Sequence, residues 1–150
     1  MYGKKRAFTL TEAVLTIVIM GILAVVILPH FVNEGFVGGL TLRSATSGIT
    51  ADIKYTRQLA LTNSGHYLIK FDFNQREYNI YKDDILPGNQ VGEVKKISSD
   101  IALSGTDQFD FYPLGNCLFS GEGLSLSLSA NQYRIIVEPP SGAVVIEKIS

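Results

Sequence analysis

KKRAFTLTEAVLTIVIMGILAVVILPHF, from Lys4 to Phe31, is the most informative stretch of this sequence. Three cations at its start are followed by one carboxylate, Glu12, and then by residues 13–32, which contain no Asp, Glu, Lys or Arg. At about 1.5 Å per helical residue, such a run covers roughly 30 Å, the thickness of the hydrocarbon layer of a bilayer. The stretch therefore predicts a membrane-spanning helix with an acidic side chain at its entrance.

Ala7 and the following Phe8-Thr9-Leu10-Thr11-Glu12 resemble the N-terminus of type IV prepilins and of type II secretion pseudopilins. In that family a short basic leader and a small residue precede Phe-Thr-Leu-x-Glu and an apolar helix. The family usually has Gly in place of Ala7 and an aliphatic residue in place of Thr11. The resemblance implies that a prepilin peptidase cleaves between Ala7 and Phe8 and that the new Phe8 amine is N-methylated. It also implies that Glu12 pairs with the Phe8-equivalent amine of a neighbouring subunit.

Three other interpretations fit parts of this stretch. A secretory signal peptide also begins with cations, but its apolar run is usually shorter and ends in a small-x-small site, whereas Leu28-Pro29-His30-Phe31 follows here. A plain signal anchor explains the apolar run and the cations but not Glu12. A capping box, with Thr9 as N-cap and Glu12 at the third helical position, also fits. The capping box is compatible with the prepilin interpretation.

Length and composition fit a membrane anchor with one small head. Setting aside residues 1–36 leaves 114 residues for a globular core. The formal charge of −1 becomes about −4 once the three leader cations are removed, so the head lacks the positive charge typical of nucleic-acid binding. Cys117 is the one cysteine in the sequence, which excludes an intrachain disulfide and predicts a small buried apolar residue.

The helical pattern is interrupted and then resumes. Pro29 removes an amide donor and is predicted to kink or loosen the first helix. Three glycines are expected to add flexibility after it: Gly35, Gly38 and Gly39. From Leu40 to Thr62 apolar residues recur at helical spacing and predict an amphipathic helix, with the core positions Leu42, Ala45, Ile49, Ile53 and Ala60. Gly65 is predicted to end this helix in the left-handed conformation.

After Gly65 the period becomes two, which predicts antiparallel strands. Residues 67–73 and 77–82 are expected to form a hairpin, and residues 83–94, with Pro87-Gly88-Asn89, a loop. Leu124 to Ser129 alternates apolar and polar residues, so one face should be buried and the other wet. Residues 133–138 and 143–149 flank Pro139-Pro140-Ser141-Gly142 and predict a second hairpin. Short strands are predicted in between, at residues 94–97, 101–103 and 109–112.

The sequence predicts no catalytic, cofactor or metal site. His30 and His66 form no metal-ligand spacing with each other or with Cys117. Asp83-Asp84 combined with Asp52 or Glu93 could form a calcium site, but the twelve-residue calcium-loop pattern is missing, which favours solvated acids. Five aromatic residues of the first hairpin suggest a nucleic-acid stacking platform or core packing, and the lack of a basic groove favours packing: Tyr67, Phe71, Phe73, Tyr78 and Tyr81.

The fold class predicted is α+β and pilin-like, with a long N-terminal helix packed on antiparallel β-sheet, as in the GspH/FimT-like branch of minor pilins and pseudopilins. The expected parts are a leader (1–7), a transmembrane and filament-core helix (8–35) and a head (36–150) with its helix at about 40–63 and its strands in 66–150. The resemblance implies a non-enzymatic filament subunit in the bacterial inner membrane, with its head outside. The expected partners are other pilin-like subunits, the prepilin peptidase and membrane lipid, but not nucleic acid. The alternatives are a DNA-uptake minor pilin, disfavoured by the absence of a basic cluster in residues 147–150, and a signal-anchored periplasmic enzyme or binding protein.

Overall fold

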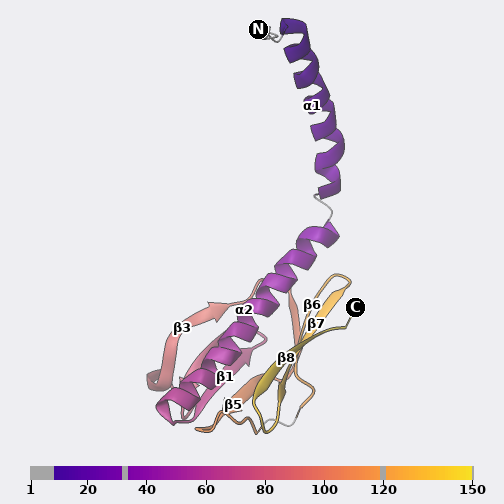
Figure 1. The fold of residues 1–150 in the computed structure, drawn as a ribbon. Coiled ribbons are helices and arrows are strands. Elements are labelled where there is room, and N and C mark those ends of the chain that lie inside the picture. Colours follow the sequence, from indigo (N-terminus) through magenta and orange to yellow (C-terminus); the bar gives the residue numbers. More distant parts are fainter. Residues whose placement is uncertain (1–8, 32–33, 119–120, 150) are drawn as a thin grey trace, which may run out of the picture. The chain divides into compact units, whose positions relative to one another are not determined.

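The computed structural model describes residues 9–31, 34–118 and 121–149, with the side chains of residues 27–36 left out. The chain divides into two compact units, Met1–Val37 and Gly38–Ser150, each of which is described by itself (Figure 1). Helix α1 (Leu10–Phe31) belongs to the first unit. Its backbone is helical through Pro29 and the helix ends at Phe31, so the kink or loosening predicted at Pro29 stays a prediction.

Helix α2 (Glu34–Asn63) begins six residues before the predicted start at Leu40. Gly35, Gly38 and Gly39 therefore lie within a helix and not in a separate linker, while the flexibility expected of them stays a prediction. The head packs against this part of the helix: a Cβ on Gly38 would lie 3.5 Å from Leu128, and one on Gly39 would lie 3.7 Å from the Asn131 amide. Tertiary contacts thus outweigh the low helix propensity of glycine.

The C-terminus of α2 differs in detail from the prediction. Ser64, with φ 47°, takes the left-handed conformation that was expected of Gly65. The Gly65 amide donates to the Ala60 carbonyl at 3.2 Å, which is the six-to-one bond of a Schellman cap. The helix therefore ends where the sequence predicted, but the left-handed residue is Ser64 and not Gly65.

One face of α2 is buried as the periodicity predicted. Leu42, Ile49, Ile53 and Ala60 are at most 2 % exposed, whereas the cations Arg43 and Lys54 lie on the exposed surface. The buried face also includes Thr46, Thr50 and Thr56, which the apolar pattern did not include. Each threonine hydroxyl donates at 2.8 Å to the carbonyl four residues earlier, so burial leaves these hydroxyls hydrogen-bonded.

Within the described residues the strands form two antiparallel four-stranded sheets. The first has the order β3-β2-β1-β5 and the second β4-β6-β7-β8. Both predicted hairpins are present, with Ile69 opposite Ile80 in the first and Ile135 opposite Ile146 in the second. The strand bounds are β1 (Tyr67–Asp72), β2 (Glu77–Lys82), β3 (Gln90–Lys96), β4 (Ala102–Gly105), β5 (Gln108–Phe111), β6 (Leu124–Leu128), β7 (Asn131–Glu138) and β8 (Ala143–Lys148).

Strand β3 corrects the extent of the predicted loop at residues 83–94. The strand begins at Gln90, directly after a short 3-10 helix at Pro87–Asn89. Its register against β2 shifts between Tyr78 and Ile80, and Gly92 has φ 83°. A bulge of this kind lets the chain continue pairing across a glycine, which a pattern search interprets as a turn.

The core lies between α2 and the sheets and is made of aromatic and aliphatic side chains from every layer. Phe71 stacks on Tyr78 at 5.1 Å and meets the edge of Phe109 at 6.3 Å. Of the hairpin aromatics, Tyr67, Phe71 and Tyr78 are buried in the core and Phe73 packs against it, as expected, whereas Tyr81 is half-buried outside the core cluster. Cys117 is fully buried, which confirms its predicted place. In β6 the alternation of buried and exposed side chains is incomplete, because Ser125, which was predicted to face solvent, is only 8 % exposed.

Candidate functional site

The first turn of α1 contains the described part of the predicted assembly site. Ala7 and Phe8, the predicted cleavage and methylation residues, lie outside the described residues. Thr9 caps the helix: its Oγ1 accepts the Glu12 amide proton at 3.3 Å, and its carbonyl accepts the Glu12 and Ala13 amides at 3.1 and 3.2 Å. Thr9 and Glu12 therefore occupy the predicted N-cap and third helical positions. This cap uses the backbone of Glu12 and leaves its exposed carboxylate available for other contacts.

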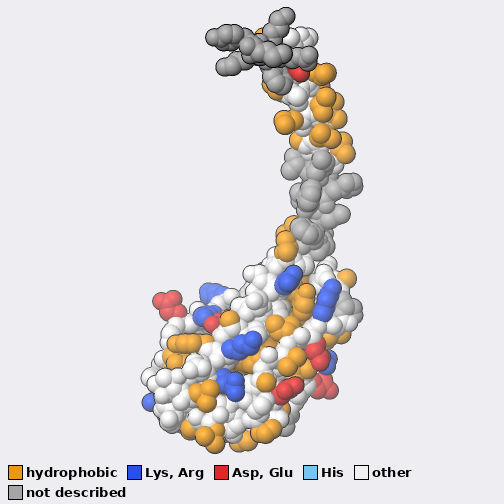
Figure 2. All heavy atoms as spheres, in the orientation of Figure 1, with side chains coloured by type: hydrophobic (Ala, Val, Ile, Leu, Met, Phe, Trp, Pro, Cys, Tyr) orange, Lys and Arg blue, Asp and Glu red, His pale blue; other side chains and the backbone are white. Residues whose placement is uncertain are grey.

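The described surface of α1 is almost entirely apolar (Figure 2). Its large side chains are 48 % to 85 % exposed, and they include Leu10, Val14, Leu15, Ile17, Met20, Ile22 and Val25. A helix that is hydrophobic all round is normally buried in protein or lipid. In the described part of the chain no helix meets the length and hydropathy needed for a membrane span, so the span expected at residues 8–35 is not found there.

Pro29, predicted to kink the helix, lies in the last turn of α1. Its imide has no proton to donate, so the ladder of helical hydrogen bonds is broken at this residue. His30, the histidine of the apolar run, also lies within α1.

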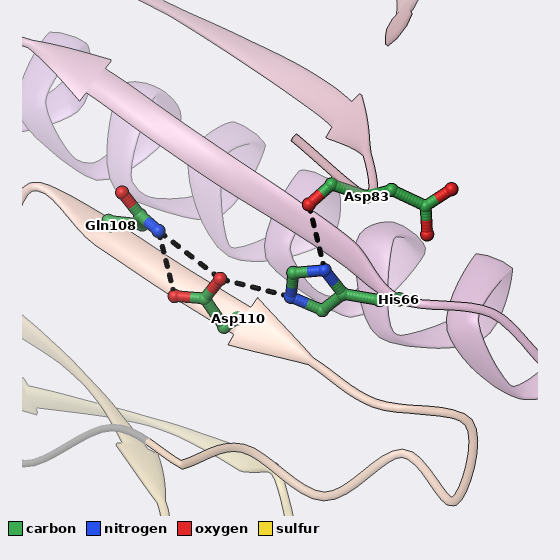
Figure 3. Close-up of polar contacts among 4 residues, drawn as sticks. All are labelled: His66, Asp83, Gln108 and Asp110. Carbon is green, nitrogen blue, oxygen red and sulfur yellow. Dashed lines mark hydrogen bonds and ion pairs between the residues drawn. The ribbon is translucent and has the colours of Figure 1, made fainter. Parts of the chain in front are cut away.

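A polar cluster of His66, Asp83, Gln108 and Asp110 lies close to the C-terminus of α2 (Figure 3). His66 contacts two acceptors: its Nδ1 lies 2.9 Å from the Asp83 carbonyl, and its Nε2 lies 3.1 Å from Asp110 Oδ1. Gln108 donates to both oxygens of Asp110, at 3.2 and 2.9 Å. The imidazole also stacks on Tyr112, with the ring centres 4.8 Å apart. The cluster fixes the chain after β2 to the end of β5.

A second cluster joins α2 to β2 and β3. Asp52 accepts hydrogen bonds from the Tyr78 hydroxyl at Oδ2 and from the Lys95 ammonium at Oδ1, both at 2.6 Å. Burial raises the pKa of Tyr78 well above its usual value, and the bond to Asp52 raises it further. Tyr78 therefore remains a donor, while the half-exposed Lys95 adds a screened ion pair.

The structure does not bring together a calcium site from Asp83 and Asp84 with Asp52 or Glu93. Both Asp52 oxygens are occupied by Tyr78 and Lys95, whereas Asp83 and Asp84 belong to the loop beside His66. Within the residues described, no group of three or more His, Cys, Asp or Glu side chains is placed to hold a metal ion.

Arg57 connects three parts of the head. Its Nε donates to the Gly115 carbonyl at 3.0 Å and its Nη2 donates to the Ser141 carbonyl at 2.9 Å. Gly142, next to Ser141, has φ 68°, and a Cβ there would lie 2.1 Å from the Gly115 carbonyl oxygen. The β7–β8 turn is thus held tightly against the β5–β6 loop.

Sequence reasoning found the residues of the N-terminal site but missed these clusters in the head. The partners are far apart in the chain: the residue numbers of Asp52 and Tyr78 differ by 26, and those of His66 and Asp110 differ by 44. Neither pair has a local spacing rule like that of the capping box. The available signal was an acidic residue, Asp52, directly beside the apolar position Ile53 on the amphipathic helix.

Comparisons with known proteins agree with both parts of the chain. Residues 2–28 match the family pattern described as the prokaryotic N-terminal methylation motif. The structure is similar to two crystal forms of the type IV minor pilin FimU of Pseudomonas aeruginosa, with TM-scores of 0.55 and 0.56 at 11 % and 12 % identity. The matches cover 71 % of this chain and 87 % and 92 % of FimU.

The minor pseudopilin EpsH from the type 2 secretion system of Vibrio cholerae is similar to the same degree. Its TM-score is 0.52 at 11 % identity, over 70 % of this chain and 94 % of EpsH. No curated protein sequence matches the chain. The chain is therefore pilin-like: it carries a prepilin-type methylation motif, and its helix and antiparallel sheets have the fold of minor pilins and pseudopilins.

Proposed function

We propose that the chain is a minor pilin or minor pseudopilin, a structural subunit of a type IV pilus or type II secretion pseudopilus, placed in the filament or at its tip. The observation that carries the proposal is the combination of the methylation motif at residues 2–28 with a head of the pilin fold. A signal-anchored enzyme would share the anchor but would not need this motif. On this proposal the role of the chain in protein secretion is mechanical.

Processing is the first step of the proposed mechanism. The leader cations Lys4, Lys5 and Arg6 stay in the cytoplasm, and the head lies on the other side of the inner membrane. The prepilin peptidase then cleaves after Ala7, and the Phe8 amine is methylated. Mass analysis of the mature N-terminus tests this step, and a mature end beyond Leu28 would contradict it, because that end indicates an ordinary signal peptide.

The apolar surface of α1 supports the next step, burial among other subunits. Burying one large aliphatic side chain contributes about 1.5–3 kcal/mol, and most of the described surface of α1 consists of such side chains. Lipid provides that environment before assembly, and the helices of neighbouring subunits provide it in the filament core. On this proposal Pro29 lets the end of α1 adapt to the packing of its neighbours.

In this proposal Glu12 fixes the axial position of the subunit relative to its neighbour in the filament. A charge in the centre of a membrane helix costs about 2.5–3.5 kcal/mol on insertion scales and less near the interface. A unit pair at about 4 Å with an effective dielectric near 20 has about 4 kcal/mol of attraction before desolvation is subtracted. These magnitudes are comparable, so pairing with the Phe8 amine of a neighbouring subunit offsets the cost of the carboxylate and fixes the axial position.

The test separates this charge from the helix cap. Glu12→Gln keeps the Glu12 amide that donates to Thr9 but removes the charge, whereas Thr9→Ala removes the cap and keeps the charge. We expect Glu12→Gln and Glu12→Ala to reach the membrane but to lose co-purification with other pilin-like subunits. Glu12→Asp should be intermediate, and Thr9→Ala should still assemble. Normal assembly of Glu12→Gln would show that the charge pair has no role.

A further inference from the structure

In the described part of the chain the two sheets end in four edge strands, and three of these edges have features that discourage pairing with another chain. Strands β4 and β5 have only four residues each. Strand β3 is longer, but its register against β2 is broken at the bulge around Gly92, and Glu93, Lys95 and Lys96 give it charge. Short strands, bulges and charges are the usual protection of an open sheet edge.

The fourth edge strand, β8, lacks this protection over most of its length (Figure 1). Its six residues pair with β7 in an uninterrupted register, and no described strand pairs with its other side. Its charges, Glu147 and Lys148, lie at one end, whereas the three residues before them are β-branched. Of these, Val145 is 38 % and Ile146 is 43 % exposed, and as consecutive strand residues they lie on opposite faces of the sheet. The edge is therefore regular, apolar and open.

The backbone of β8 indicates which kind of molecule fits this edge. The Ile149 amide donates to the Gln132 carbonyl at 2.9 Å, which continues the ladder with β7. Because hydrogen-bonded residues alternate in an antiparallel pair, the amides and carbonyls of Val144, Ile146 and Lys148 point away from β7. These groups repeat every second residue, or about 6.8 Å. An extended polypeptide presents its own amides and carbonyls at the same repeat, so it can pair with all three residues.

The side chains of β8 define the sequence that such a polypeptide needs. Ile146 lies opposite Ile135, which is fully buried, yet Ile146 itself is half-exposed. A further strand would place one side chain beside Ile146 on the core face and the next beside Val145 on the outer face. Pairs of β-branched and aromatic side chains stabilise neighbouring strands most. The edge therefore fits an extended segment with β-branched or aromatic residues on both faces.

We propose that β8 receives such a strand from a different pilin-like subunit, so that the sheet β4-β6-β7-β8 continues across the subunit boundary. This inference rests on the proposed function, in which the neighbours of a minor subunit are other pilin-like chains. The partner strand pairs with the outward backbone groups of Val144, Ile146 and Lys148. In contacts of this kind the main-chain hydrogen bonds supply affinity and the side chains select the partner.

Amide hydrogen exchange resolved to single residues tests the pairing. It compares the full chain alone in detergent with the full chain in the complex that co-purifies with other pilin-like subunits. The three outward amides of β8 should exchange at least about tenfold more slowly in the complex. The Lys96 amide is the control: the Ile97 amide donates to the Arg76 carbonyl, so the Lys96 amide points away from β2 at another edge, and its exchange should not change.

Substitutions at the edge provide the second arm. Ile146→Pro removes one outward donor and keeps the bonds to β7, since proline is tolerated where the amide faces solvent. It should weaken co-purification with other pilin-like subunits about tenfold, whereas Lys96→Pro, the same change at the β3 edge, should have no effect. Ile146→Lys places a charge against the partner strand and should also weaken co-purification. Val94→Lys is its control, because Val94 is 42 % exposed on β3. Circular dichroism of each variant verifies that the head is folded.

The outcomes separate this inference from the proposed function. Unchanged exchange of the three outward amides in the complex, or normal co-purification of Ile146→Pro, would refute the pairing. Slower exchange of these amides in the chain alone as its concentration rises would assign the edge to a second copy and would also overturn the proposal. If the chain assembles and Glu12→Gln prevents assembly while the β8 edge is unaffected, the proposed function stands and this inference alone fails. If the chain never co-purifies with pilin-like subunits, both fail.

Discussion

Replacing Arg57 by alanine tests whether one side chain holds the two sheets of the head together. The guanidinium donates to the carbonyls of Gly115 and Ser141, at 3.0 and 2.9 Å, and thereby joins α2 to the β5–β6 loop and the β7–β8 turn. Arg57→Ala removes both donors without opening a large gap in the apolar core. The β7–β8 turn should therefore loosen from the rest of the head.

The two lost hydrogen bonds are not equivalent. Gly115 is buried, so its carbonyl loses a charged donor that water replaces poorly, and leaving such a group unsatisfied costs about 1–3 kcal/mol. Ser141 is exposed, so water replaces the second bond at a cost of about 0–1 kcal/mol. The expected loss is about 2 kcal/mol of unfolding free energy, or on the order of 10 °C in melting temperature for a domain of this size. Arg57→Lys keeps one donor and should lose about half as much.

The assay is thermal unfolding of the full chain in detergent, followed by near-ultraviolet circular dichroism of the tyrosines, to which the tyrosine-free helix α1 does not contribute. Amide hydrogen exchange of β8 gives a local measurement, and its protection should fall first. Lys54→Ala, an exposed cation on the same helix, is the control and should change little. An Arg57→Ala variant as stable as Lys54→Ala would refute the argument that these two bonds hold the turn in place.

Three further predictions concern the head. Gly142→Ala should cost at least about 2 kcal/mol in chemical unfolding, because its Cβ would collide with a carbonyl at φ 68°, whereas Gly88→Ala, with open space around it, should be nearly neutral. Tyr78→Phe should destabilise the head at pH 8 but less at pH 11, since the raised pKa of Tyr78 means that its contribution is complete below about pH 10 and is lost as pH rises further. An unchanged difference at the two pH values would contradict this. Phe109→Ala should cost about 3–5 kcal/mol by emptying a fully buried position, as measured by denaturant titration.

Local patterns were sufficient for most of the secondary structure. The spacing of Leu42, Ile49 and Ile53 identified the buried face of α2, and alternation identified both hairpins. Such patterns work because a helix and a strand repeat their orientation every 3.6 and 2 residues. They failed at the start of α2 and at β3, where glycines suggested a linker and a loop. Gly38 and Gly39 lie close to Leu128 and Asn131, and β3 pairs with β2 on both sides of Gly92, so tertiary contacts hold these glycines in regular structure.

Local spacing likewise predicted some contacts of the candidate sites and not others. The cap formed by Thr9 on Glu12 was predictable, because its partners are three residues apart. The cluster of His66, Asp83 and Asp110 was not, because it exists only after β1 pairs with β5 and the chain turns after β2. In the sequence His66 has no recognisable partner, whereas in the structure it contacts both Asp83 and Asp110.

The sequence by itself determined the N-terminal motif, the apolar helix and the order of helices and strands, since each depends on residues close together in the chain. The tertiary structure decided which strands share a sheet, which polar residues meet and which surfaces remain exposed. Asp52 with Tyr78 and Arg57 with Gly115 show the reason: their contacts depend on how α2 packs against strands and loops that come later in the chain. That packing is set by the whole core at once, so no local spacing encodes it.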